Sequence, residues 1–133
     1  MQVPSLYYLN IPYSIQCRRD LMKYLKLYVQ PEGADTAAML GDATLGTVKL
    51  LLKVLKVSPP GSEAPASIGV VAPGGRFMEF TRIAEDRYVV KYKDPERGIS
   101  AIGSMPLSRV FECLESFFQG KERSVCLPLM EKW

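Results

Sequence analysis

Aromatic and basic side chains alternate along one short segment of the chain, 87–93. If this segment is a β-strand, Tyr88 and Tyr92 share one of its faces. Lys91 and Lys93 then share the other face. Flat rings can stack on nucleobases and ammonium groups can neutralise phosphates, so the pattern is typical of single-stranded nucleic-acid binding. The alternative interpretation is core packing, which requires hydrogen-bond partners for the tyrosine hydroxyls.

Basic residues are also concentrated on two segments that have a helical period. The segments 14–29 and 44–57 each carry cations at steps of four and three residues, which places those cations on one helical face. Such a stripe attracts polyanions, although the solvated face of an ordinary helix gives the same pattern. The predicted phosphate-binding residues are Arg18, Arg19, Lys23, Lys26, Arg76, Arg82, Lys91 and Lys93, and the predicted stacking residues are Tyr88 and Tyr92.

Residue types on which many enzymes depend are scarce. The chain has no histidine, and histidine is the commonest general base near neutral pH and the commonest zinc ligand. The glycine spacing of 41–46 is that of a phosphate-binding loop, but Thr47 and Val48 stand where Lys and Ser or Thr are required. We therefore predict a non-enzymatic protein that uses no cofactor and no metal.

Two further groups of residues, carboxylates and cysteines, are of types that can form metal, redox or disulfide sites. Four carboxylates lie in expected turns beside basic residues, where solvation explains them better than a metal-dependent nuclease site does. The cysteines are widely spaced, and they fit neither a CxxC motif nor a secreted disulfide framework. We expect the cysteines to be small buried apolar residues. The carboxylates are Glu85, Asp86, Asp94 and Glu96, and the cysteines are Cys17, Cys113 and Cys126.

The chain has 133 residues, 47% of them hydrophobic, so we assign residues 1–133 to a single domain. Helices are expected where apolar residues recur at steps of three and four. Short runs rich in β-branched and aromatic residues, separated by turn sequences, predict antiparallel strands. The expected helices are 14–29, 44–57 and 105–118, and the expected strands are 67–72, 76–83, 87–93, 99–103 and 123–127.

These elements predict an α+β fold of order ααββββαβ, in which an antiparallel meander sheet of four to five strands is packed by three helices. The helix 105–118 has a wide apolar stripe, so Phe111 and Leu114 are expected to be core residues. Phe77 and Phe80 are expected in the core as well. If part of the stripe is exposed instead, the same helix would form the interface of a homo-oligomer.

Several general features of the chain point towards one family. Helices precede a four-stranded meander, the late helix is rich in phenylalanine, and asparagine and glutamine are rare. In these features, carried mainly by 76–118, the chain resembles the ThermoDBP-related single-stranded DNA-binding proteins of hyperthermophilic archaea. The resemblance implies a thermophilic, archaeal source and a cleft between sheet and helices. In that cleft bases would stack on aromatic rings while a basic rim holds phosphates, without catalysis.

The sequence also indicates where the protein works and which functions compete. No apolar run is long enough to span a bilayer, and the first residues do not have the pattern of a secretory signal, so we expect a cytoplasmic protein. The predicted function is sequence-tolerant binding of single-stranded nucleic acid, with DNA implied by the resemblance. The alternatives are a protein-interaction or regulatory subunit, a peripheral membrane binder that uses helix 44–57, and a hydrolase.

Overall fold

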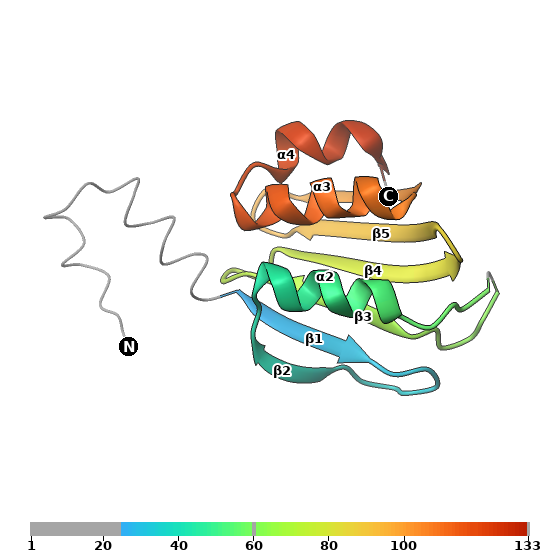
Figure 1. Cartoon of the computed structure of the whole chain (residues 1–133). Helices are drawn as coiled ribbons and strands as arrows, with labels where there is room; N and C mark the ends of the chain where they lie inside the picture. Colours follow the sequence, from blue (N-terminus) through green and yellow to red (C-terminus); the bar gives the residue numbers. More distant parts are fainter. Residues whose placement is uncertain (1–24, 60, 133) are drawn as a thin grey trace, which may run out of the picture.

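One antiparallel sheet of seven strands forms the framework of the protein (Figure 1). The computed structural model describes residues 25–59 and 61–132. Neighbouring strands follow the order β2-β1-β3-β4-β5-β6-β7 across the sheet. The strands are β1 (Lys26–Gln30), β2 (Ala38–Asp42), β3 (Ser67–Val71), β4 (Phe77–Ala84), β5 (Arg87–Asp94), β6 (Ile99–Met105) and β7 (Glu131–Lys132).

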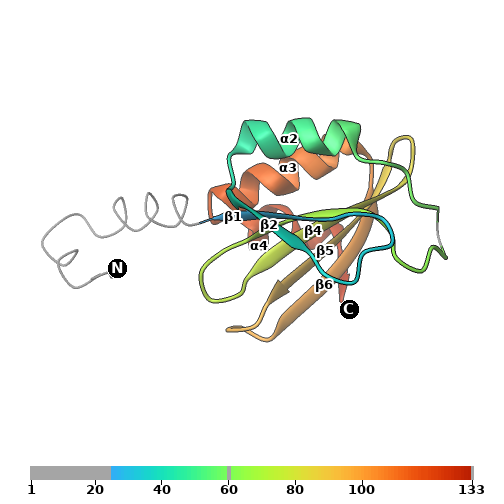
Figure 2. The ribbon, with the colours of Figure 1, turned by 90° about the horizontal axis from the view of Figure 1, so that it is seen from below.

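Two helices, α2 (Leu45–Val54) and α3 (Leu107–Phe118), lie on the same side of the sheet (Figure 2). The first begins at Thr44, whose hydroxyl oxygen accepts a hydrogen bond from the Thr47 amide at 3.3 Å. The second begins after Pro106, and its first amide donates to Asp86 Oδ1 at 2.9 Å. A short helix, α4 (Glu122–Val125), and a 3-10 turn, η2 (Leu127–Leu129), complete the helical elements of the described residues.

The core lies between the sheet and these two helices. Alternate residues of β4 and β5 point towards the helices, as the period of two in a strand requires, and most of them are buried. The apolar stripe of α3 covers them, and α2 closes the layer over β3. Residues with no exposed surface on these elements are Val48, Leu52, Val70, Met78, Phe80, Tyr88, Val90, Tyr92, Val110, Cys113 and Leu114.

The turn between β3 and β4 depends on two glycines. Gly74 and Gly75 have φ angles of 89° and 90°, a left-handed conformation that glycine adopts without steric cost. The Gly75 amide donates to the Ala72 carbonyl at 3.1 Å, which closes the turn. The sequence Pro73-Gly74-Gly75 therefore reverses the chain at the predicted place.

The central part of the predicted fold is confirmed. The meander expected over 67–103 is present, because β3, β4, β5 and β6 pair one after another in antiparallel register. The helices expected over 44–57 and 105–118 are also present, as α2 and α3, with somewhat shorter bounds.

The predicted order ααββββαβ and the number of strands are wrong. An additional hairpin, β1 and β2, precedes α2, and β7 lies at the opposite edge, so the sheet has seven strands. The segment 26–29, expected as the end of the first helix, belongs to β1, because Leu27 and Val29 pack towards the helices at a spacing of two. Residues 14–24 of that expected helix lie outside the described residues. The expected strand 123–127 is also wrong, since α4 occupies most of it.

Two of the cysteines form a disulfide, which the sequence did not predict. Cys113 of α3 and Cys126, which follows α4, are joined, with their Cα atoms 4.9 Å apart. Both are fully buried, as expected, but they are paired rather than separate apolar residues. The bond fastens the α4 segment to α3. Cys17 lies outside the described residues.

Truncation of the α3 stripe should destabilise the fold. We expect Leu114→Ala to lower the free energy of unfolding by about 2–5 kcal/mol, because it leaves a cavity in the core. The matched control is Leu50→Ala on α2, where the residue is 62% exposed and a change within about 0.5 kcal/mol is expected. Urea denaturation followed by circular dichroism measures both. Equal stabilities for Leu114→Ala and the wild type would contradict the packing of α3 on the sheet.

Candidate functional site

The sheet has two faces of different character. One face is covered by α2 and α3, whereas no helix of the described residues covers the other (Figure 2). We call the second one the open face. Cross-strand partners share a face, so the registers of β1, β3, β4, β5 and β6 define its central residues. These are Tyr28, Gly69, Val71, Phe77, Glu79, Lys91, Lys93, Ser100 and Ile102.

Tyr28 lies across Gly69 on the open face. A Cβ atom at Gly69 would come within 2.0 Å of the Tyr28 ring carbon Cζ, so only glycine at this position lets the ring cross the sheet. The Tyr28 hydroxyl donates to Glu79 Oε1 at 2.8 Å. Burial, and then the negative charge of Glu79, raises the pKa of Tyr28 well above its ordinary value. The ring is therefore neutral and fixed across two neighbouring strands.

Phe77 of β4 lies on the same face in the neighbouring row of the sheet. Its direct cross-strand neighbours are Val71 on β3 and Lys93 on β5. Its side chain is partly exposed, so it is not the core residue that the sequence predicted. Lys91 stands opposite Glu79 in the row of Tyr28. Two aromatic rings and two lysines thus occupy adjacent rows of one uncovered surface.

The two tyrosines predicted to stack on bases point to the other side of β5. Tyr88 and Tyr92 have no exposed surface. The Tyr88 hydroxyl donates to the Leu52 carbonyl of α2 at 2.8 Å, and the Tyr92 hydroxyl donates to Glu122 Oε2 at 2.8 Å. Burial raises the pKa of both hydroxyls. Both rings therefore pack in the core, and their hydroxyls connect the sheet to α2 and α4.

The two predicted strand arginines also make structural contacts on the helix side. Arg76 donates to Glu122 Oε2 at 2.5 Å, and its guanidinium lies 4.3 Å from the centre of the Phe117 ring. Arg82 Nη1 donates to the Leu55 carbonyl at 3.1 Å. The guanidinium of Arg82 lies 5.7 Å from the centre of the Tyr88 ring. These contacts hold both guanidinium groups in place within the fold.

The predicted helix cations are partly engaged and partly outside the described residues. Lys26, on β1, forms an ion pair with Asp42 at 2.5 Å. Arg18, Arg19 and Lys23 lie outside the described residues. Of the predicted cations, the structure brings Lys26, Lys91 and Lys93 to the open face, where Lys26 and Lys93 share the row of Phe77.

Two lysines of the basic stripe predicted over 44–57 also form ion pairs. Lys49 pairs with Glu115 of α3, and Lys56 pairs with Glu32 at 2.7 Å. The leucine face of α2 packs on the sheet, with Val48 and Leu52 fully buried. An interfacial membrane helix needs this face for lipid, whereas in the structure the face is part of the core. None of the helices in the described part of the chain is long and apolar enough to cross a membrane.

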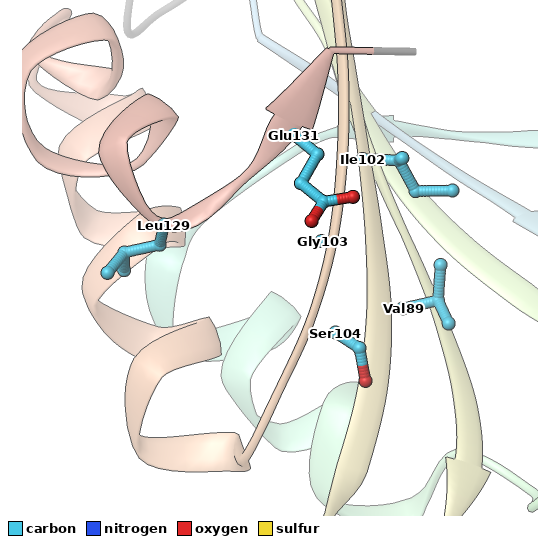
Figure 3. Close-up of a pocket in the computed structure, with 6 residues that line it drawn as sticks. All are labelled: Val89, Ile102, Gly103, Ser104, Leu129 and Glu131. Atoms are coloured by element: carbon cyan, nitrogen blue, oxygen red, sulfur yellow. The ribbon is translucent and has the colours of Figure 1, made fainter.

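Two cavities adjoin the open face. A polar cavity of about 340 Å³ lies at its β1 end, and Asp35, Glu63, Glu79 and Lys91 are among the residues that line it. A second cavity, of about 440 Å³, lies beside β6, where the polar side chains of Glu131 and Ser104 join a lining that includes Val89, Ile102 and Leu129 (Figure 3). Among residues 25–59 and 61–132, no three His, Cys, Asp or Glu side chains are grouped so that they could hold a metal ion. The aromatic and basic rows between the two cavities are the strongest candidate site.

Comparisons with known proteins add no further assignment. No family model matches the chain, and no curated protein or solved structure matches it. The resemblance to the ThermoDBP-related proteins therefore stays a prediction from the sequence.

The buried ion pair of Arg76 should contribute far more to stability than a surface pair. We expect Arg76→Met to lower the free energy of unfolding by about 3–5 kcal/mol, because Glu122, only 4% exposed, would keep a buried charge without its partner. The matched control is Arg109→Met, which breaks the exposed pair with Glu112 and should cost less than about 1 kcal/mol. Chemical denaturation measures both. Equal small losses would show that Arg76 is solvated.

An alkaline titration should distinguish Tyr28 and Tyr92, whose hydroxyls donate hydrogen bonds to carboxylates, from solvent-exposed tyrosines. The pKa values of Tyr28 and Tyr92 are raised in the folded protein above the ordinary value of 10.0. The unfolded chain ionises near pH 10, so the stability from these hydroxyls is present below that pH and is lost as the pH rises above it. We expect the ultraviolet absorbance of these two phenolates to appear only together with unfolding. Ionisation of every tyrosine near pH 10 in the folded protein would contradict the burial.

Proposed function

We propose that the protein binds single-stranded nucleic acid on the open face of its sheet, without catalysis and with little sequence preference. The observation that carries the proposal is the pair of aromatic rings, Tyr28 and Phe77, in rows that also contain Lys91 and Lys93 on a face that no helix within 25–59 or 61–132 covers. Every nucleobase has a flat face that can stack on such rings, and nearby ammonium groups can neutralise the phosphates between the bases.

The arrangement favours single strands over duplex. Base stacking on a protein ring requires an unpaired base, whereas in duplex the base faces are already covered by their neighbours. No helix of the described residues projects from the open face of the twisted sheet to enter a groove (Figure 2). Two stacked bases would contribute about 1–3 kcal/mol each, and the lysines would make the affinity depend on salt.

Replacing an aromatic ring and replacing a lysine should change the binding affinity and its salt dependence in different ways. We expect Phe77→Leu to weaken binding of an oligothymidine by about 1–3 kcal/mol and to leave the salt dependence unchanged, because stacking releases no counterions. We expect Lys93→Gln to lessen the slope of log K against log salt by about 0.7. The matched charge control is Lys53→Gln on α2, outside the open face, which should change neither quantity. Fluorescence anisotropy at several salt concentrations measures all four proteins.

Two outcomes would overturn the proposal. One is equal affinity for duplex and single strands, since that would mean that stacking is not involved. The other is the absence of binding below about 100 μM at moderate salt, where even non-specific DNA binders register. In the second case the protein-interaction or regulatory subunit becomes the better hypothesis.

A further inference from the structure

Four sulfur atoms lie close together where the end of β6 meets α3 and the segment that follows α4. Cys113 Sγ lies 3.7 Å from Met105 Sδ, and Cys126 Sγ lies 3.5 Å from Met130 Sδ. The two cysteines are joined to each other, so the contacts connect all four side chains. Met105, Cys113 and Cys126 are at most 3% exposed, whereas Met130 is partly exposed. We call these four residues the sulfur cluster.

The backbone of β6 leaves room for both methionines of the cluster. Gly103 stands opposite the buried residue Val90 on β5, so it lies on the helix side of the sheet. A Cβ atom at Gly103 would come within 3.1 Å of Met130 Cγ and 3.3 Å of Met105 Cε. A side chain at this position would therefore displace both methionines. The glycine allows the two thioethers to approach the same pair of cysteines.

We propose that the sulfur cluster, with its cysteines reduced, is a binding site for Cu(I). Thiolate and thioether sulfurs are the soft ligands that select Cu(I) over harder cations. Around a tetrahedral metal with metal–sulfur bonds of about 2.3 Å, the ligand sulfurs lie about 3.8 Å apart. The two distances between cysteine and methionine sulfurs, 3.7 and 3.5 Å, are close to that spacing. Methionine often fills gaps in a core, but packing does not require a thioether beside each sulfur of the same pair.

The disulfide must be reduced before the metal binds. A dithiol reductant supplies two electrons and two protons: the bond between Cys113 and Cys126 breaks, each sulfur becomes a thiol, and the reductant closes its own disulfide. Cu(I) then replaces the two thiol protons, which pass to water, and bonds to both thiolates and both thioethers. No electron moves in this second step. Because protons are released, the affinity for Cu(I) rises with pH.

The cavity beside β6 gives an ion access to the cluster. Gly103 and Leu129 line this cavity of about 440 Å³ (Figure 3). Met130 directly follows Leu129 in the chain and is the most exposed member of the cluster. An ion can therefore reach the thioether of Met130 first, without opening of the core between the sheet and the helices.

The site is independent of the earlier expectations and of the open face. The expectation that the protein uses no metal depended on the absence of histidine and of a CxxC motif, and a thioether site requires neither. Met105 stands opposite the buried residue Tyr88, so the cluster lies on the helix side of the sheet. Binding of Cu(I) therefore does not depend on nucleic-acid binding at the open face.

Competition with a chelator measures the affinity. Every protein in the experiment carries Cys17→Ser, which removes the third thiol of the chain. After reduction with dithiothreitol and removal of the reductant under nitrogen, each protein competes with bicinchoninate for Cu(I), and the absorbance of the chelator complex reports the affinity. We expect Met105→Leu and Met130→Leu each to lower the affinity at least about tenfold, because each removes a ligand. The matched control is Met78→Leu, a fully buried methionine of β4 outside the cluster, which should leave the affinity unchanged.

Leucine nearly conserves the volume of methionine, so the variants should fold, and circular dichroism checks that they do. Equal affinities of the three leucine variants would show that the thioethers are not ligands and would overturn the proposal. Equal affinities of the oxidised and reduced proteins would do the same for the cysteines, as would a loss of fold on reduction that Cu(I) does not reverse. The affinity of the reduced protein without a leucine substitution should also rise between about pH 6 and about pH 8, because its thiols lose protons on binding. A constant affinity over that range would contradict the proposal whatever the variants show.

Discussion

The burial of two tyrosine rings on β5 determines how the two faces of this sheet are used. Tyr88 and Tyr92 are fully buried under the helices, and each hydroxyl has a hydrogen-bond acceptor, at Leu52 and Glu122. Without those acceptors each buried hydroxyl would cost free energy. Because side chains alternate along a strand, the lysines of β5 must then point to the opposite face. A register slip of one residue would exchange the two sets.

Glu122 connects this constraint to the end of the chain. Its carboxylate accepts from both Tyr92 and Arg76, so α4 is held to β4 and β5, while the disulfide between Cys113 and Cys126 holds the same segment to α3. Its other carboxylate oxygen, Oε1, is buried and accepts no hydrogen bond from the described part of the chain. In this region a positive side chain is a structural element. A count of cations along the sequence therefore overestimates the charge available to a ligand.

Local sequence patterns predicted the central part of the fold correctly because several independent patterns agreed there. Turn residues such as Pro73-Gly74-Gly75 separated runs of alternating residues, and α3 had an apolar stripe long enough to exclude a strand. The hairpin of β1 and β2 was missed because Leu25 and Tyr28 also fit a helical period, and because β2 is exposed along its whole length and so has no apolar alternation. Tertiary pairing with β3 decides in favour of the strand.

The candidate site was predicted only in part, for a related reason. Alternation placed Tyr88 and Tyr92 on one face and Lys91 and Lys93 on the other, but alternation alone does not say which face the helices cover. The usable signal was Gly69, whose missing side chain leaves room for an aromatic ring from the neighbouring strand. The pairing of that glycine with Tyr28 depends on a contact between distant parts of the chain, and no local pattern reports it.

The central claim is that the open face is the working surface of this protein, and methyl chemical shifts test it most directly. In a nuclear magnetic resonance titration with an oligothymidine, the methyl groups of Val71 and Ile102, which lie on the open face, should shift through the ring currents and proximity of the bound bases. The exposed methyl groups of Leu50 and Val54 on α2 serve as the internal control and should stay in place. Shifts confined to Leu50 and Val54 would contradict the account and move the binding surface to the helix side of the sheet.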